Sequence, residues 1–236
     1  MDPKIPYIYE TLLAHYGEET GKATERASFS PQGGNEQAQS IATWWPANTP
    51  YEVMVGAVLT QNTAWSNVEK AIANFGGSLA PELIRDMDSE TLAEIIRPAG
   101  FFKQKAGYVK NLTTWYEGYG FDVATVQTEV LEKIRGELLS VKGIGRETAD
   151  SILLYAFGFA TFVIDAYTMR LIGRYPVDAG SSYEAVKSYF EDSMPKDRKT
   201  YDIYHGLIVI HAKTHCRKKP LCDGCPLQKT CASHII

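Results

Sequence analysis

The four cysteines of the chain lie together near its C-terminus. They read Cys216-x5-Cys222-x2-Cys225-x5-Cys231, and the remaining sequence contains none. Two disulfides could form at this spacing, but the first residues carry no apolar signal segment, which favours reduced thiols. Zinc usually takes two Cys-x2-Cys pairs set well apart. One pair flanked by single cysteines in a short loop better suits a bulky [4Fe-4S] cluster, and zinc remains the alternative.

A glycine-rich string between two helical patterns could bind an anion. It reads Val141-Lys142-Gly143-Ile144-Gly145-Arg146. Gly143 and Gly145 permit positive φ and close approach of the backbone. The next helix is expected to start near Arg146, where its N–H groups and its dipole favour a negative charge. A DNA phosphate is the natural ligand, and such a contact positions a protein without reading bases. The alternative is a tight turn that needs glycine for space alone.

Charge is distributed unevenly along the chain. Residues 1–100 carry 13 acidic and 6 basic side chains, whereas the whole chain has a net charge of −4, so residues 101–236 have a net charge of +3. A uniformly basic surface is excluded, but one basic face that meets a polyanion is not. Candidate phosphate contacts around the cysteines are Lys213, Arg217, Lys218 and Lys219. A solvated basic tail is the alternative.

The elements that must position these groups are predicted to be helices. Apolar residues recur at helical spacing, Thr49-Pro50 is a strong helix start, and Ser66 begins a second capping pattern. No alternating strand pattern or internal repeat is present. Residues 17–40 are polar and predict a loop with at most one weak helix. The helices are expected at 5–16, 50–59, 66–75, 89–96, 103–116, 127–139, 147–157, 165–174, 182–194 and 198–213.

Composition narrows the class of protein. Hydrophobic residues make up 44% and charged residues 22%, values of an ordinary globular chain that exclude a disordered or fibrous protein. No stretch approaches the roughly 18 apolar residues of a membrane helix. We therefore expect a cytoplasmic protein without a membrane partner, associated with the nucleoid in a prokaryote, for which a monomer would suffice.

Three features together resemble the endonuclease III superfamily of helix-hairpin-helix DNA glycosylases. They are the hairpin string, the Asp of Val163-Ile164-Asp165, and the run from Leu207 into the cysteine loop. The resemblance covers about residues 44–231, although the first cysteine spacing is five residues where the family usually has six. It implies an all-α fold of two helical domains. One is a six-helix barrel module, 48–165, with the helix-hairpin-helix at about 132–157; the other, 1–47 with 166–236, carries a [4Fe-4S] loop at 216–231.

The resemblance also assigns chemistry to two carboxylates. Asp165 stands at the position of the family's catalytic Asp, where it would stabilise an oxocarbenium-like sugar and activate water; capping the next helix is its structural alternative. Strand-cutting relatives carry a Lys directly after the hairpin string, whereas this chain has Glu147. A carboxylate cannot form the Schiff base of a lyase, and Lys142 belongs to the hairpin. A monofunctional glycosylase is therefore predicted.

With a glutamate directly after the hairpin, the chain resembles the branch of 3-methyladenine DNA glycosylase III. Trp44-Trp45-Pro46, Gly56–Thr63 and Arg97–Ala106 support that branch. A flipped, cationic N-alkylated purine would gain from aromatic stacking. The predicted base pocket comprises Trp44, Trp45, Trp65 and Glu147, although packing in the core is the alternative for each Trp and adjacent rings cannot both face one way. Gln61 is expected to fill the space of the flipped base, with helix capping as the alternative.

Other activities remain open from sequence. The same fold and Asp165 would serve a monofunctional glycosylase for uracil or thymine mismatches, or for adenine opposite 8-oxoguanine. A bifunctional glycosylase/lyase of the endonuclease III type and a non-catalytic DNA-binding protein are less favoured. In each case the expected partner is double-stranded DNA, damaged in the enzymatic cases, and the leading prediction is excision of alkylated purines such as 3-methyladenine in base excision repair.

Overall fold

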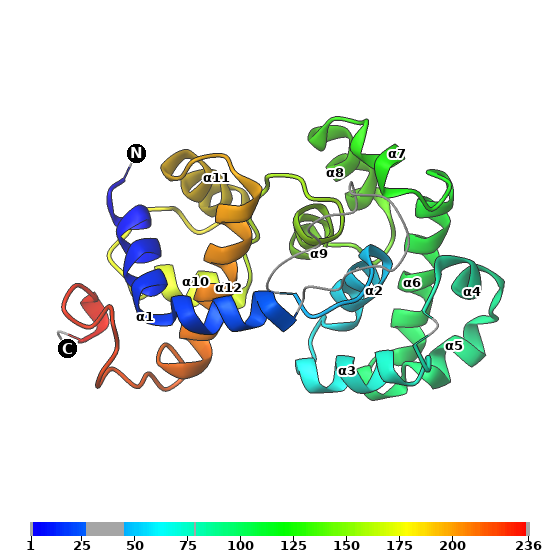
Figure 1. Cartoon of the computed structure of the whole chain (residues 1–236), viewed down its shortest axis with the longest axis horizontal. Helices are drawn as coiled ribbons and strands as arrows, with labels where there is room; N and C mark the ends of the chain where they lie inside the picture. Colours follow the sequence, from blue (N-terminus) through cyan, green and yellow to red (C-terminus); the bar gives the residue numbers. More distant parts are fainter. Residues whose placement is uncertain (1, 27–44, 78, 235–236) are drawn as a thin grey trace. The chain divides into compact units, whose positions relative to one another are not determined.

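The computed structural model describes residues 2–26, 45–77 and 79–234, and every regular element in these ranges is a helix (Figure 1). This confirms the all-α class. The chain divides into two compact units. The hairpin unit is Pro46–Phe159, and the termini unit combines the described parts of Met1–Trp45 and Ala160–Ile236. Because the second boundary falls at 159/160 and not at the predicted 165/166, Asp165 belongs to the termini unit.

The hairpin unit is built around an apolar helix, α2 (Pro50–Leu59), in which every residue from Tyr51 to Leu59 is buried. Its start is as predicted, because Thr49 Oγ1 accepts a hydrogen bond from the Glu52 backbone N–H at 3.1 Å. The other helices of this unit are α3 (Trp65–Ala73), α4 (Pro81–Asp86), α5 (Ser89–Ile95), η2 (Arg97–Ala99), α6 (Phe102–Glu117), α7 (Val123–Gln127), α8 (Leu131–Ser140), α9 (Arg146–Ser151) and the π-helical turn η3 (Ile152–Ala156).

The termini unit is built around α12 (Arg198–Thr214), which packs against α1 (Lys4–Arg26) and α10 (Ala166–Ile172). The unit also contains α11 (Tyr183–Ser193) and the short η4 (Ala232–His234). Phe162 and Phe190 stack with their ring centroids 4.6 Å apart, and Tyr204 meets both rings. Tyr9 of α1 also lies beside Tyr204, with ring centroids 5.1 Å apart, so segments from both ends of the chain share this aromatic core.

Three predicted helix boundaries were wrong. Helix α1 passes through Gly17 to Arg26, because one glycine costs a helix only about 1 kcal/mol. Ser66 does not cap α3; Ala64 is the N-cap, and no side chain caps that helix. The helix predicted over 127–139 corresponds to α8, which begins only at Leu131; the preceding α7 was not predicted, and Asp122 caps it by accepting hydrogen bonds from Ala124 N and Thr125 N. None of the described helices is long and apolar enough to cross a membrane.

Candidate functional site: a hairpin, a capped carboxylate and a cysteine loop

The hairpin joins α8 to α9, and its two glycines serve different needs. Gly143 has φ +100°, and a Cβ there would stand 2.1 Å from ring atoms of Tyr108. Both the backbone conformation and the space therefore require glycine at this position. Gly145 does not use the positive φ that glycine permits; its φ is −91°, and nothing lies within 4 Å of an added Cβ. The fold thus leaves open space at Gly145, which is exposed.

Side chains from elsewhere in the hairpin unit hold the hairpin carbonyls inward. Gln61 Nε2 donates to Gly143 O and to Thr148 Oγ1, each at 3.0 Å. Asn111 Nδ2 donates to Lys142 O at 3.1 Å. These acceptor oxygens are turned toward the protein, which suits a hairpin that meets an anion on its other side. Lys142 and Arg146 are exposed, as phosphate contacts must be.

A buried ammonium group ties two further loops together. Lys105 is 2% exposed, and its Nζ donates to Leu59 O and Ala99 O, each at 2.8 Å. Burial lowers the pKa of Lys105 to about 8. Gln61 follows one of these carbonyls along the chain, and Phe101 follows the other. Lys105 therefore fixes the bases of both loops.

Phe101 is a candidate functional residue that sequence analysis did not single out. It is 67% exposed and has φ +49°, a left-handed conformation that is rare for a bulky residue. An aromatic side chain held in solvent by a strained backbone is suited to contact another molecule. The Gly100-Phe101-Phe102 string is the only sequence signal for this feature.

Asp165 begins α10 and is 9% exposed. Its Oδ1 accepts hydrogen bonds from Thr168 N at 2.7 Å and Thr168 Oγ1 at 2.9 Å, so the expected capping role is present. Its Oδ2 lies 3.5 Å from Nε2 of His205 on α12. Burial acts to raise the pKa of Asp165, but the hydrogen bonds and charge supplied by His205 and Thr168 outweigh it. The net pKa is lowered, so the carboxyl is ionised at neutral pH.

The remaining acceptor capacity of this carboxylate can be counted. A carboxylate offers about four acceptor positions, two on each oxygen. Thr168 takes both positions on Oδ1, whereas His205 Nε2 lies 3.5 Å from Oδ2 without hydrogen-bond geometry. Within the described part of the chain no other contact to Asp165 occurs, so Oδ2 keeps acceptor capacity for water or an electron-poor carbon.

The far end of α10 holds the cysteine loop. Arg170 Nε donates to Cys216 O at 2.7 Å, and Arg174 donates to Arg217 O at 2.6 Å and Lys218 O at 2.9 Å. Arg174 Nη1 also lies 3.3 Å from Cys216 Sγ. The helix that starts at Asp165 is therefore anchored to the loop at its other end. Lys213, Arg217, Lys218 and Lys219 have exposed side chains.

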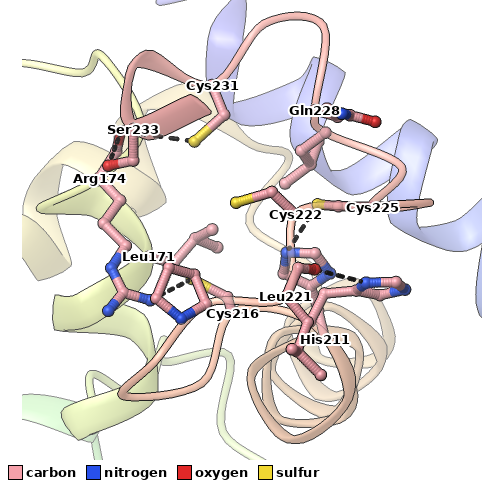
Figure 2. A pocket seen from close by; sticks show the side chains of 13 residues that line it. Leu171, Arg174, His211, Cys216, Leu221, Cys222, Cys225, Gln228, Cys231 and Ser233 are labelled. Carbon is pink, nitrogen blue, oxygen red and sulfur yellow. Dashed lines mark hydrogen bonds between the residues drawn. The ribbon is translucent and has the colours of Figure 1, made fainter. Parts of the chain in front are cut away.

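All four cysteines are free thiols that line one pocket (Figure 2). The pocket contains about 390 Å³ of empty space, open solvent included. Burial, and then the neighbouring cysteines, raise the pKa of Cys225. His211 Nε2 lies 3.9 Å from Cys225 Sγ. Among the described residues, no three His, Cys, Asp or Glu side chains are close enough to hold a single metal ion.

The predicted base-pocket residues do not all come together in one unit. Trp45 is buried in the termini unit, whereas half-buried Trp65 begins α3 of the hairpin unit. Glu147 is exposed in the first turn of α9. Trp44 lies outside the described residues. The aromatic pocket thus stays a prediction from sequence.

Comparison with known proteins places the chain in a family. Residues 55–196 match the HhH-GPD superfamily base excision DNA repair protein family. A Methanocaldococcus jannaschii protein assigned, but not demonstrated, as a DNA repair glycosylase is 50% identical over 231 residues, which cover 96% of this chain and 94% of that protein. The chain belongs to the HhH-GPD superfamily of base excision DNA repair proteins, which confirms the family predicted from sequence.

Two solved structures resemble the fold. H. pylori 3-methyladenine DNA glycosylase (MagIII) bound to 1,N6-ethenoadenine has a TM-score of 0.69 and 27% identity, over 87% of this chain and 97% of that one. A trapped covalent endonuclease III–DNA intermediate has a TM-score of 0.74 and 20% identity, over 100% of this chain and 97% of that one. At 20% identity the second likeness concerns the fold alone.

Proposed function

We propose that this protein is a monofunctional DNA glycosylase that hydrolyses the N-glycosidic bond of flipped alkylated purines such as 3-methyladenine. The observation that carries the proposal is Asp165, a buried and ionised carboxylate with acceptor capacity left on Oδ2. As the bond to the base breaks, positive charge develops on the sugar and the carboxylate stabilises it. The cationic base leaves as a neutral purine; water adds to C1′ and releases its proton through Asp165.

The lysines around the hairpin do not supply an amine nucleophile. A lyase needs an uncharged amine that reaches the sugar. Lys105 has a lowered pKa, but its Nζ is buried and bonded to two carbonyls. The first turn of α9 carries Glu147. Exposed Lys142 lies on the hairpin, where contact with phosphate is its proposed role.

The substrate class rests on charge and on one similarity. An N3- or N7-alkylated purine is cationic while bound to the sugar, so it leaves without protonation by the enzyme. Stacking on Trp rings stabilises such a base by about 1–2 kcal/mol per contact when water is excluded. We assign Trp45 and Trp65, with Trp44, to this pocket, and Glu147 to its charged edge. The 27% identical MagIII structure is named as a 3-methyladenine DNA glycosylase and holds 1,N6-ethenoadenine, which supports a modified purine as substrate but, as an uncharged base, not the charge argument.

Each unit would contact the sugar-phosphate backbone of DNA through its own set of groups. In the hairpin unit these are Lys142, Arg146 and the open space at Gly145; in the termini unit they are Lys213, Arg217, Lys218 and Lys219. Each lost phosphate contact should reduce the salt dependence of binding by about one unit. Phe101 extends from a loop fixed by Lys105 and is suited to enter the base stack, whereas Gln61 would first have to release its hydrogen bonds to Gly143 O and Thr148 Oγ1.

We further propose that Cys216, Cys222, Cys225 and Cys231 hold a [4Fe-4S] cluster. Four free thiols around one pocket form the required donor set, and a cluster spaces its ligands more widely than a single ion does. When bound, it supplies four iron–thiolate bonds that close the loop. The chain's own residues Arg170 and Arg174 then transmit that rigidity to α10. Iron and sulfide analysis of the purified protein tests this assignment.

A release assay tests the proposed function. Duplex DNA carrying 3-methyladenine, 7-methylguanine, uracil or thymine opposite guanine is incubated with the protein, and free bases are identified by mass spectrometry. Release of methylated purines alone is expected. Release of uracil or thymine in their place would reassign the substrate, and no release from any duplex would favour a non-catalytic DNA-binding protein.

A further inference from the structure

We infer that His205 is the positioning residue of the reaction, which directs the remaining acceptor capacity of Asp165 toward the sugar and water. This inference rests on the proposed function of Asp165. His205 lies on α12 and Asp165 at the start of α10, so the contact joins two helices far apart in sequence. Its Nε2 is 3.5 Å from Asp165 Oδ2.

The two carboxylate oxygens are held by different parts of the fold. Oδ1 is fixed by Thr168 within α10 itself, as in any capped helix. Those two bonds fix the position of Oδ1. They do not restrain Oδ2, so the carboxylate can still turn. His205 restrains the second oxygen from α12. With both oxygens restrained, the lone pairs of Oδ2 point in fixed directions.

Helix packing alone does not account for this polar contact. Both helices already bury apolar side chains, including Leu171 on α10 and Leu207 and Ile208 on α12. His205 is 4% exposed, and burying an imidazole next to a carboxylate is rarely the most stable choice for a helix interface. An apolar residue would pack there at lower cost. The histidine is explained if the orientation of the carboxylate matters to the reaction.

The contact with His205 is also compatible with the charge of Asp165. An imidazole N–H turned toward Oδ2 restrains that oxygen and leaves it a carboxylate oxygen, which the oxocarbenium requires. A residue without a donor would leave Oδ2 free to rotate. A lysine in this place would neutralise the carboxylate that the reaction uses. Histidine supplies a donor of fixed geometry at the required distance.

Two substitutions test the N–H donor of His205 separately from the volume of its side chain. His205→Leu removes the donor, whereas His205→Gln can place an amide N–H near the position of Nε2. Val209→Ala, on the same buried helix, is the matched control, because it loosens packing without touching the carboxylate. For each variant we would measure the single-turnover rate of methylpurine release, the Kd for DNA with a stable abasic analogue, and Tm.

We expect His205→Leu to lower the single-turnover rate roughly 10- to 100-fold, the effect of losing one polar contact to a charged group, with Kd unchanged. His205→Gln should recover most of the rate. Val209→Ala should lower Tm and keep the rate. If His205→Leu keeps the wild-type rate while Asp165→Asn is inactive, the inference is wrong and the proposed function stands. Equal rate losses in both His205 variants, or a similar loss in Val209→Ala, would also overturn it.

Discussion

The hairpin unit and the termini unit hold their functional groups by different means. In the hairpin unit, side-chain amides and the Lys105 ammonium donate to backbone carbonyls, and the charged groups Lys142 and Arg146 remain exposed. In the termini unit, a carboxylate is buried and its two oxygens are held by side chains and one backbone N–H. Binding a phosphate needs a shaped backbone, whereas stabilising a cation needs a fixed, dehydrated charge. The difference predicts that substitutions in the two units will separate DNA binding from base release.

The largest effect is expected at Asp165. Asp165→Asn keeps an oxygen that can cap α10, so folding and DNA affinity should be retained. The negative charge is lost, and the rate of base release should fall at least 10²- to 10³-fold. Single-turnover kinetics test the expected loss of rate, and Kd measurements test the retained DNA affinity. A variant that binds DNA and releases base at the wild-type rate would remove Asp165 from the reaction.

The next effect concerns the two hairpin glycines. Gly143→Ala would bring a Cβ to 2.1 Å from Tyr108 at φ +100°, so the free energy of unfolding should fall by about 1–3 kcal/mol and DNA affinity with it. Gly145→Ala is the matched control, because its Cβ meets nothing within 4 Å. It should keep stability, so any loss of DNA affinity reports close approach of the DNA backbone. Equal stability of the two variants would contradict this distinction.

A smaller effect is expected at Phe101. Phe101→Ala removes an exposed ring, so the free energy of unfolding should change by less than about 0.5 kcal/mol. Loss of stacking on DNA bases should weaken binding about 5- to 10-fold in a fluorescence titration. Val130→Ala, which removes another exposed apolar side chain at 64% exposure, should leave binding unchanged. The same Kd for both variants would show that Phe101 stays outside the DNA.

The last prediction concerns the pH dependence of stability contributed by Lys105. Its pKa is about 8 in the folded chain and 10.5 in its ordinary state, so between these values the unfolded chain binds more protons. The free energy of unfolding therefore rises with pH through this range. Relative to Lys105→Met, the wild type should gain about 2 kcal/mol between pH 7.5 and 10. Denaturant unfolding at both pH values measures the difference; a constant difference would mean that Lys105 keeps its ordinary pKa.

Local sequence was sufficient for features set by neighbouring residues. The Thr49 cap, the hairpin between two helices and the cap position of Asp165 were all predicted, because each depends on three or four consecutive side chains. Helices were predicted where apolar residues recur at helical spacing. The resemblance then supplied the fold and the chemistry proposed for Asp165 and Glu147.

Contacts between distant segments could not be predicted. His205 meets Asp165, and Arg174 meets the cysteine loop, only after α10 and α12 have packed. The burial of Lys105 depends on two carbonyls that end separate helices. The sequence permitted a positive φ at both Gly143 and Gly145, yet only Gly143 adopts one, and Gly145 has an ordinary φ and open space. Sequence identifies the conformations a residue permits; packing decides which one occurs.

The central claim is that a carboxylate acts here without an amine partner, and borohydride trapping tests it most directly. The protein is incubated with lesion-containing duplex and with abasic duplex in the presence of borohydride, beside a bifunctional glycosylase/lyase as positive control. We predict base release without a covalent protein–DNA adduct, and unbroken abasic strands. A strong covalent adduct with this chain would contradict the account, because only a Schiff base to an amine could produce it.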